Sequence, residues 1–362
     1  MYLDKIYLLQ FKNYEEADIS FSDKINVIVG ENGSGKTNLL DAIYYLCLSK
    51  SAFQNLDNFN IFHEKEFFLI KGNIIENEKK HEITCSLQRG KKKILLVNKV
   101  PYEKMTEHIG RFPCILISPN DTELITDGSE NRRKFFDGLI SQTDSKYLEQ
   151  LMIYSWALKQ RNSTLKLFAE KKTFDPSWLE SYNQKILEIG KFLAEKRQEI
   201  IFRFIPIFEK YYQILSRDQE KVNVFYETEA LKDDFEQIFA NNLEKDLFLQ
   251  RTNKGIHKDD YKFVLGNFPI NKFGSQGQQK SFVIALKLAQ FTLSKELKNH
   301  SPILLLDDIF DKLDDKRMKK LLEIVSGNHF GQVFITDARS DRALSFFGEN
   351  VHIFQVRKGK IL

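Results

Sequence analysis

Gly30-Glu-Asn-Gly-Ser-Gly-Lys-Thr37 is the stretch of this sequence that decides the fold. Ile25-Asn-Val-Ile-Val29 stands directly before it and, as a β-branched run, predicts a strand. Residues 38–46 stand directly after it and place apolar side chains at helical spacing. A strand, a glycine-rich loop and a helix in this order are the context of a phosphate-binding loop, or P-loop. A chance glycine-rich turn is the alternative, and it explains the order of the three segments less well.

Each part of this loop has a predicted role in binding Mg-ATP. Backbone N–H groups that the glycines leave free can surround phosphates, and the positive end of the helix dipole assists them. We expect Lys36 to reach the β- and γ-phosphates as a catalytic residue and the Thr37 hydroxyl to bind Mg²⁺. The predicted nucleotide contacts in this segment are Gly30, Glu31, Asn32, Gly33, Ser34, Gly35, Lys36, Thr37 and Asn38.

A second motif, Ile303-Leu-Leu-Leu-Asp-Asp308, joins four apolar residues to two carboxylates. This pattern is typical of a buried parallel strand that carries acids at its carboxyl end, where ligands bind in such sheets. We expect Asp307 to hold Mg²⁺ and Asp308 to orient or deprotonate the attacking water. An ordinary strand followed by a polar turn remains the alternative.

A third motif, Phe273-Gly-Ser-Gln-Gly-Gln-Gln-Lys-Ser281, precedes an apolar segment with helical character. Here a glycine-rich turn would present a hydroxyl and the N–H groups of a helix N-terminus to a phosphate. The predicted contacts are Ser275, Gln276, Gly277 and Gln278. A capped helix without a ligand is the alternative, and the order of the three motifs favours the phosphate site.

The distribution of strand-like and helical patterns along the chain predicts two lobes. Residues 1–120 and 255–362 have strand-like runs and glycine-rich loops, with an antiparallel meander between about residues 66 and 117. Residues 121–254 have charged segments with helical periodicity. Pro206 interrupts the helical pattern and predicts the end of a helix or a kink. The predicted fold class is α/β: a head with parallel and antiparallel sheet, plus an inserted, mostly helical lobe.

The composition limits the possible partners. Lysine and arginine number 54 against 50 acidic residues, a net charge of +4, so any nucleic-acid surface must be a local patch. Neither a long apolar run nor an export or lipidation signal occurs, and we therefore expect a cytoplasmic protein without membrane contact. The spacing of Cys47, Cys85 and Cys114 matches neither a zinc site nor a disulfide framework.

Together the three motifs resemble those of the ATP-binding-cassette (ABC) ATPases, with residues 274–278 in the place of the signature motif. More narrowly, the chain is similar to the RecF family of bacterial recombination mediators. The segments that carry this resemblance span nearly the whole chain: Phe11-Lys-Asn-Tyr14, Gly30 to Asp41, Ser118-Pro-Asn-Asp121, Arg132-Arg-Lys-Phe-Phe-Asp137, Gly255-Ile-His-Lys-Asp-Asp260, Gly274 to Lys280 and Leu304 to Asp308.

The resemblance implies an ATP-dependent DNA-binding protein of repair, replication restart and the SOS response. In ABC proteins the signature turn of one subunit closes on the nucleotide of another, so the resemblance implies a homodimer that ATP holds together. It implies weak, DNA-stimulated ATP hydrolysis that acts as a release timer. It further implies binding at gaps or junctions of single-stranded and duplex DNA, and loading of RecA with RecR and RecO.

Basic clusters are the candidate DNA contacts, because lysine and arginine can replace counterions on phosphates. They are Arg89, Lys91, Lys92 and Lys93, then Arg132, Arg133 and Lys134, with Lys171-Lys172 as a further pair. A solvated face is the alternative for each cluster, and the second could pair with Asp121 and Glu123. His257, Asp259 and Asp260 lack the further ligands that a zinc site needs and predict a structural turn.

Two readings of the motifs remain open beside this one. The first is an ABC-type ATPase subunit of another complex, such as a membrane transporter or a chromosome clamp with a long coiled coil. The second is a scaffold that binds ATP without significant hydrolysis. Residues 337–339 after the last predicted strand read Asp-Ala-Arg, without the histidine that senses the γ-phosphate in transporters, and leave that sensor unidentified.

Overall fold

The computed structural model describes residues 1–216, 220–309, 314–327, 329–339, 346–347 and 351–362. The chain forms two compact units. Unit 1 comprises Met1–Thr122, Lys210–Gln219 and Ser275–Leu362. Unit 2 comprises Glu123–Glu209 and Glu220–Gly274.

A mainly parallel sheet carries the P-loop and the acidic motif in unit 1. Its strand order is β15-β14-β3-β13-β12-β8, and only β15 pairs antiparallel with its neighbour. The pairings of Leu306 with Ile335 and of Asp337 with Val29 bring the carboxyl ends of β12, β13 and β3 to one edge. The strands are β3 (Ile25–Val29), β8 (Cys114–Ile117), β12 (Ile303–Leu306), β13 (Val333–Asp337), β14 (His352–Arg357) and β15 (Lys360–Ile361).

An antiparallel sheet completes the strands of unit 1, in the order β2-β1-β4-β5-β6-β7. Its strands are β1 (Tyr2–Phe11), β2 (Tyr14–Ser20), β4 (Phe67–Glu76), β5 (Lys79–Gln88), β6 (Ile94–Val97) and β7 (Val100–Pro101). The predicted meander is confirmed for β4 to β7 but wrong for Cys114–Ile117, which pairs parallel with β12. Four consecutive buried residues in β8 suit a strand that is covered on both faces.

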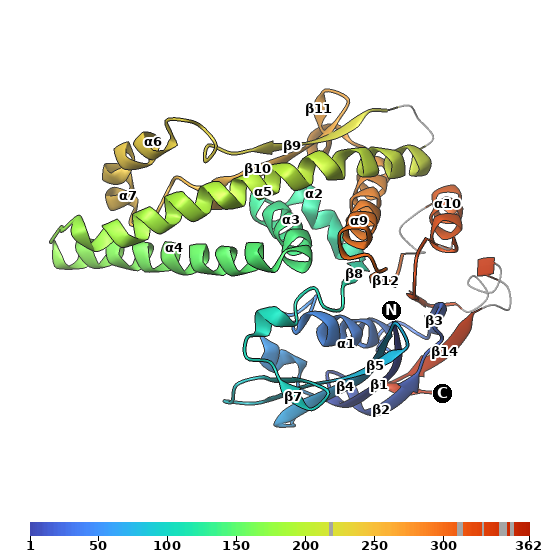
Figure 1. The fold of residues 1–362 in the computed structure, drawn as a ribbon. Coiled ribbons are helices and arrows are strands. Elements are labelled where there is room, and N and C mark those ends of the chain that lie inside the picture. The colour runs from blue at the N-terminus through green and yellow to red at the C-terminus, as the bar shows by residue number, and fades with distance from the viewer. Residues whose placement is uncertain (217–219, 310–313, 328, 340–345, 348–350) are drawn as a thin grey trace. The chain divides into compact units, whose positions relative to one another are not determined.

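Helix α1 (Lys36–Leu48) packs against strands of both sheets, and its apolar residues join theirs in one core (Figure 1). Such two-sided burial explains why most of this helix is apolar rather than striped. The remaining helical elements of unit 1 are α9 (Gln276–Lys298), α10 (Asp315–Val325), η1 (Asp57–Asn60), η2 (Met105–Glu107) and η3 (Pro119–Thr122).

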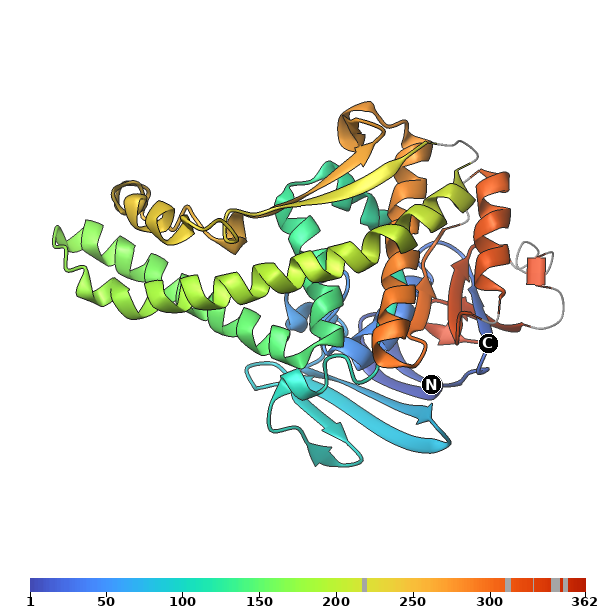
Figure 2. The ribbon, with the colours of Figure 1, turned by 45° about the horizontal axis from the view of Figure 1, so that its top comes forward.

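Unit 2 is mostly helical, as the sequence indicates. Its two longest helices, α4 and α5, run side by side in Figure 1 and Figure 2, and α5 continues into residues assigned to unit 1. A three-stranded antiparallel sheet, ordered β11-β10-β9, also belongs to unit 2. The elements are α2 (Glu123–Thr126), α3 (Ser129–Thr143), α4 (Ser145–Lys171), α5 (Ser177–Leu215), β9 (Val222–Glu227), α6 (Phe235–Asn241), α7 (Leu243–Leu249), η4 (Ile256–Lys258), β10 (Asp260–Leu265), β11 (Phe268–Pro269) and α8 (Ile270–Phe273).

Pro206 lies inside α5 and does not end it, so this part of the prediction is wrong. Proline removes the hydrogen bond to the carbonyl of residue i−4, which here is Phe202. Phe202 is 82% exposed, on the side of the helix where water can solvate the freed carbonyl. Phe204 and Phe208, on either side of the proline, are fully buried, and their packing keeps the helix continuous.

The compact units differ from the predicted lobes at three places. The smallest difference is that residues 121 and 122 belong to unit 1, and the two larger ones have a structural reason. Residues 255–274 belong to unit 2, because β10 forms its ladder with β9, from Asp260 opposite Glu227 to Leu265 opposite Val222. Residues 210–219 belong to unit 1, where Tyr212 packs against Phe282 of α9. Segments that are distant in sequence decide both boundaries.

Among the residues that the structure describes, none of the helices combines the length and the apolar character that crossing a membrane requires.

Candidate functional site

The P-loop follows β3 at the carboxyl edge of the parallel sheet, where three distant segments hold it. The Gly30 N–H donates to the carbonyl of Asp337 in β13 at 3.3 Å. The Tyr14 hydroxyl donates to the Gly35 carbonyl at 3.0 Å, and the Gly359 N–H donates to the Ser34 carbonyl at 2.8 Å. The last two bonds satisfy loop carbonyls from outside, whereas the first engages the N–H of Gly30.

Two glycines are required here by geometry. Gly35 has φ 119°, and a Cβ on it would lie 3.0 Å from Oδ1 of Asn13. Gly359 has φ 73°, and a Cβ on it would collide with the Asn13 carbonyl. Asn13 itself donates to the Ser34 carbonyl at 3.1 Å and accepts from Asn38 Nδ2 at 2.7 Å. A side chain at either glycine would displace the asparagine that supports the loop.

The Lys36 ammonium lies within the loop. Its side chain is buried, and Nζ donates to the carbonyls of Gly30 at 2.7 Å and Glu31 at 3.0 Å. Ser34 Oγ is also buried and finds no hydrogen-bond partner among the described residues. A polar cavity of about 300 Å³ opens beside them, lined by Asn32, Gly33, Gly35, Lys36, Thr37, Asn38, Asp308 and Thr336. The buried ammonium, the spare hydroxyl and the open space at Gly33 fit a phosphate chain.

The acidic strand reaches the same cavity. Asp307, which is 4% exposed, accepts hydrogen bonds from the hydroxyls of Thr37 at 2.9 Å and Thr336 at 2.8 Å. Burial raises the pKa of the Asp307 carboxyl, while its bonds from Thr336 and Thr37 lower it. Among the described residues it forms no ion pair. Carboxylate and hydroxyl oxygens are the ligands that Mg²⁺ prefers, so Thr37 and Asp307 fit this ion.

Asp308, the second acid, lines the cavity with a fixed backbone. It has φ 47°, a left-handed conformation that is uncommon outside glycine, and its N–H donates to Thr336 Oγ1 at 2.8 Å. Thr336 therefore contacts both acids at once, as donor to Asp307 and acceptor from Asp308. Such local strain persists only where the surroundings enforce it.

The signature turn has the geometry of a capped helix. Ser275 is the N-cap of α9: its hydroxyl accepts from the Gln278 N–H, and Gln278 Oε1 accepts from the Ser275 N–H at 2.7 Å. None of the four predicted turn residues, 275 to 278, is among the residues that line the P-loop cavity. Within one described chain, the two segments that are predicted to bind phosphates therefore do not share a cavity.

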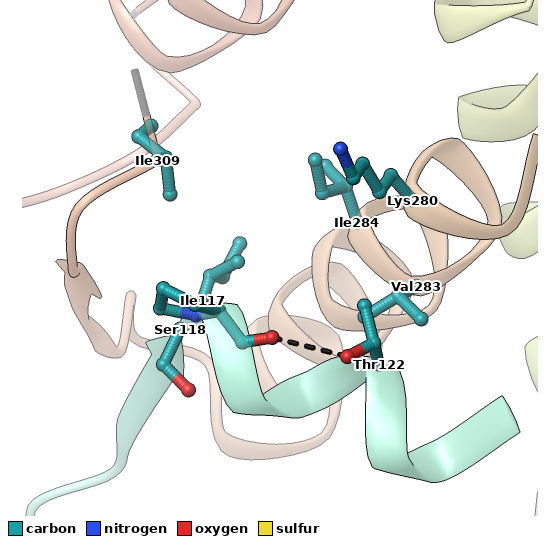
Figure 3. A pocket seen from close by; sticks show the side chains of 8 residues that line it. Ile117, Ser118, Thr122, Lys280, Val283, Ile284 and Ile309 are labelled. Carbon is teal, nitrogen blue, oxygen red and sulfur yellow. Dashed lines mark hydrogen bonds between the residues drawn. The ribbon is translucent and has the colours of Figure 1, made fainter. Parts of the chain in front are cut away.

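An apolar pocket also lies against α9, and it does not suit a nucleotide (Figure 3). Its volume is only about 50 Å³, and a hydrogen bond from Thr122 Oγ1 to the Pro119 carbonyl crosses its wall. The lining consists of Ile117, Ser118, Pro119, Thr122, Lys280, Val283, Ile284 and Ile309, with Lys280 as the only charged member.

Several residues of the site lie outside the motifs that identified it. Asn13 and Tyr14 belong to a segment used only for the resemblance, and Thr336 had no predicted role although its strand was expected. Gly359 could not be connected to the P-loop from the sequence. A polar residue at the carboxyl end of a predicted central strand is the one signal that singles out Thr336.

The residues of the first basic cluster, Arg89 to Lys93, lie in two different environments. Arg89, Lys91 and Lys92 are exposed on the turn between β5 and β6. Lys93 instead points into unit 1, where its ammonium contacts Asp57 at 2.8 Å and the Ser49 carbonyl at 2.5 Å. This structural role argues against Lys93 as a DNA contact.

The second basic cluster lies on α3 and forms internal bonds in unit 2. Arg132 pairs with Asp260 at 2.8 Å, and Arg133 donates to the Asp259 carbonyl at 2.6 Å. Lys134 pairs with Glu130 on the exposed surface. The alternative that Arg132 pairs with an acid is therefore confirmed, but the partner is Asp260 and not Asp121.

His257 is part of a structural turn. Its Nδ1 lies 2.8 Å from the Tyr154 hydroxyl and its Nε2 lies 3.0 Å from the Thr252 carbonyl. Burial lowers the pKa of His257 to about 4, so the ring is neutral near pH 7. Nowhere in the described residues do three or more histidine, cysteine, aspartate or glutamate side chains gather as a metal site would require.

A model of the RecF/RecN/SMC N-terminal domain family matches residues 2–361. The chain is 50% identical to the DNA replication and repair protein RecF of Cytophaga hutchinsonii over 364 residues, which cover all of this chain and 96% of the relative. The chain belongs to the RecF family. Another RecF, from Flavobacterium johnsoniae, is 48% identical over 94% of this chain and 95% of its own.

Solved structures of the RecF family have the same fold. The recombination mediator protein RecF with ATPrS in the RecFOR pathway superposes with a TM-score of 0.89 at 26% identity, covering 99% of this chain and 97% of the other. Its ATP-bound counterpart gives the same score and identity over 100% and 97%. The Smc head of Pyrococcus furiosus, at 18% identity and a TM-score of 0.58, shares the fold alone. The predicted fold class, an ABC-type ATPase head with an additional helical lobe, is confirmed.

Proposed function

We propose that this protein is an ATP-dependent DNA-binding protein of DNA replication and recombinational repair, which closes as a dimer on DNA and opens on ATP hydrolysis. The observation that carries the proposal is the cavity in which Lys36, Thr37 and the acidic strand meet at the carboxyl edge of the parallel sheet. The names of the relatives, a DNA replication and repair protein and a recombination mediator, support the DNA part.

In the proposed reaction, different residues of the cavity bind the phosphates, bind Mg²⁺ and activate the attacking water. Lys36 exchanges its two carbonyl contacts for phosphate oxygens, and backbone N–H groups at the N-terminus of α1 bind the remaining charge. Thr37 and Asp307 hold Mg²⁺, which when bound neutralises charge on the phosphates. Asp308 orients or deprotonates the attacking water, and the bond from its N–H to Thr336 holds its backbone in place.

A second copy of the chain completes the site. Because the signature turn of the same chain does not line the cavity, Ser275 to Gln278 of another copy are proposed to contact the phosphates. ATP then favours the closed dimer, and hydrolysis returns the population to monomers. The reaction acts as a slow timer for release, and DNA accelerates it.

DNA contacts are proposed for Arg89, Lys91 and Lys92, whose side chains are exposed. Gaps and junctions of single-stranded and duplex DNA are the proposed substrates. RecR is the proposed direct partner, with RecO and RecA acting through it in the SOS response. Lys134 remains a weaker candidate because Glu130 pairs with it.

Light scattering with ATP, ADP and a nonhydrolysable analogue tests the dimer. We expect wild type to dimerise with the analogue and ATP but not with ADP. Lys36→Ala should lose roughly 100-fold in ATP affinity, because it removes a charge-assisted contact, and remain monomeric. Ser275→Arg should bind ATP yet stay monomeric. A wild type that remains monomeric with the analogue contradicts the proposal.

Phosphate release separates the timer from a scaffold that only binds ATP. We expect slow release by wild type, faster release with tailed duplex DNA, and background release by Lys36→Ala. Equal background release from both proteins would favour the scaffold.

Salt titration of binding to tailed duplex tests the DNA contacts. Replacing Lys91 and Lys92 together by alanine should weaken binding and reduce the salt slope by about two. Lys79 and Lys80, also exposed and adjacent but not among the candidate DNA contacts, provide the matched control pair. An unchanged slope in the first variant would exclude these lysines as phosphate contacts.

A further inference from the structure

Arg317, which none of the three motifs contains, lies against the signature turn. A Cβ built on Gly277 would lie 3.2 Å from the Cζ of Arg317 and 3.4 Å from its Nη2, with Nη1 closer still. The guanidinium therefore occupies the space that any side chain at Gly277 would need. Gly277 sits in the first turn of α9, two residues after the Ser275 N-cap.

The arginine is itself anchored. Asp314 caps α10: its carboxylate accepts from the Arg317 N–H at 2.9 Å and from Nη1 at 2.8 Å. A carboxylate that binds both the backbone and the side chain of one residue limits the rotamers open to that side chain. Arg317 is 28% exposed, so its side chain is mostly enclosed although its head is charged. The ion pair with Asp314 thus holds the guanidinium against Gly277.

This contact joins two segments that the proposed reaction uses. Helix α10 follows the acidic strand in the chain, and α9 begins with the signature turn. The first N–H groups of α9 can bind an anion only if the turn keeps its direction, and a 1 Å displacement costs much of such an interaction. A rigid group on the Gly277 side of the turn restricts that displacement.

We infer that Arg317 is a positioning residue for the signature turn, which it braces at Gly277 so that the turn can close over the nucleotide held by a second copy. The inference rests on the proposed function, because closure between copies is the event that it affects. It assigns a reason to the glycine at position 277, where no positive φ requires one. Gly277 makes room for the arginine.

The test measures dimerisation with a nonhydrolysable ATP analogue and, separately, analogue binding to the monomer at low protein concentration. Arg317→Ala should weaken the dimer about 10-fold or more and change monomer affinity for the analogue by less than twofold. Arg317→Lys, which keeps the charge but not the planar group, should recover part of the dimerisation. Lys319→Ala is the matched control, because it removes the same charge from an exposed position of the same helix and should change neither quantity.

A double-mutant cycle distinguishes bracing from general electrostatics. Gly277→Ala should displace the guanidinium and reproduce the defect of Arg317→Ala, and the double variant should be no worse than either. Additive defects, a Lys319→Ala defect equal to that of Arg317→Ala, or loss of analogue binding by the Arg317→Ala monomer would each overturn the inference. If wild type itself remains monomeric, the proposed function fails and this inference falls with it.

Discussion

Two carboxylates, Asp307 in unit 1 and Asp137 in unit 2, have different kinds of partner. In unit 1, Asp307 has only the hydroxyls of Thr37 and Thr336 as partners and forms no ion pair among the described residues. In unit 2, Asp137 accepts two hydrogen bonds at 2.9 Å from the Arg197 guanidinium and one at 2.6 Å from Tyr147. The arginine is 2% exposed and also pairs with Asp259.

This difference separates a site that binds a cation from a cluster that holds a fold together. A buried charge is costly unless an opposite charge neutralises it. In unit 2, Arg197 of the same unit neutralises the carboxylates. Asp307 forms no such ion pair among the described residues, so its charge is available to a cation from solution. Removing Arg197 should therefore reduce the stability of unit 2, and removing the charge of Asp307 should reduce catalysis in unit 1.

The largest effect is expected from Arg197→Met. It leaves the buried Asp259 and the partly buried Asp137 without their cation, and we expect the free energy of unfolding to fall by about 3 to 5 kcal/mol. Denaturant unfolding monitored by tryptophan fluorescence measures it, since both tryptophans, Trp156 and Trp178, lie in unit 2. A loss below about 1 kcal/mol would remove the distinction between the two carboxylate environments.

Asp307→Asn tests the other side of the comparison. We expect ATP hydrolysis to fall roughly 100- to 1,000-fold, because the amide is a poor ligand for Mg²⁺. Stability near pH 7 should be unchanged or slightly greater, since burial raises the pKa of this carboxyl and the native state gains from losing the charge. Asp137→Asn, the matched change in unit 2, should reduce stability instead. Equal destabilisation by both would contradict the comparison.

Acid should weaken both units through one buried histidine in each. The rings of His108 and His257 each lie between a backbone carbonyl and a tyrosine hydroxyl, and burial lowers each pKa to about 4. Because the unfolded chain binds these protons near pH 6.5 and the native state only near pH 4, stability is complete above pH 6.5. It should fall by about 3 kcal/mol per histidine as the pH decreases to 4.

Unfolding free energies measured between pH 7 and 4 check this prediction. His257→Gln should lower stability at pH 7 and flatten the pH dependence by one proton. An unaltered pH dependence in that variant would show that His257 is not the group that titrates.

The smallest effect is expected from Thr336→Val. The change removes one hydrogen bond to Asp307 and one from Asp308, and we expect a loss of about 1 to 2 kcal/mol in stability. Hydrolysis should fall about 10-fold, because the backbone of Asp308 loses the bond that holds it in place. Thr336→Ser should restore both. Failure of serine to do so would show that the methyl group and not the hydroxyl matters.

The sequence could predict the parts of the site that are local. Gly30 to Thr37 and the two acids after the strand at Ile303 can be recognised from the sequence, because their strand, loop and helix signals lie within a few residues of each other. Asn13, Thr336 and Gly359 contribute through contacts between distant segments, which no local pattern contains. Lys93 and Arg132 were expected at a surface for the same reason: their partners, Asp57 and Asp260, lie far away in the chain.

The fold shows the same limit. Pro206 is a strong local signal against a helix, yet packing of the residues around it prevails. The run Cys114–Ile117 has the composition of a strand, but its neighbour β12 is nearly two hundred residues later, and only that pairing makes it parallel. Local propensity thus identified elements, while tertiary contacts decided their ends and their partners.

The bond from Gly359 to the P-loop has a consequence for how the molecule is made. During translation, Gly30 to Thr37 are synthesised early. Of the residues that support this loop, Gly359 is synthesised last. A nascent chain therefore contains the P-loop long before all the residues that support the loop have been synthesised. A chain that stops before Gly359 would contain the whole P-loop and lack this bond to it.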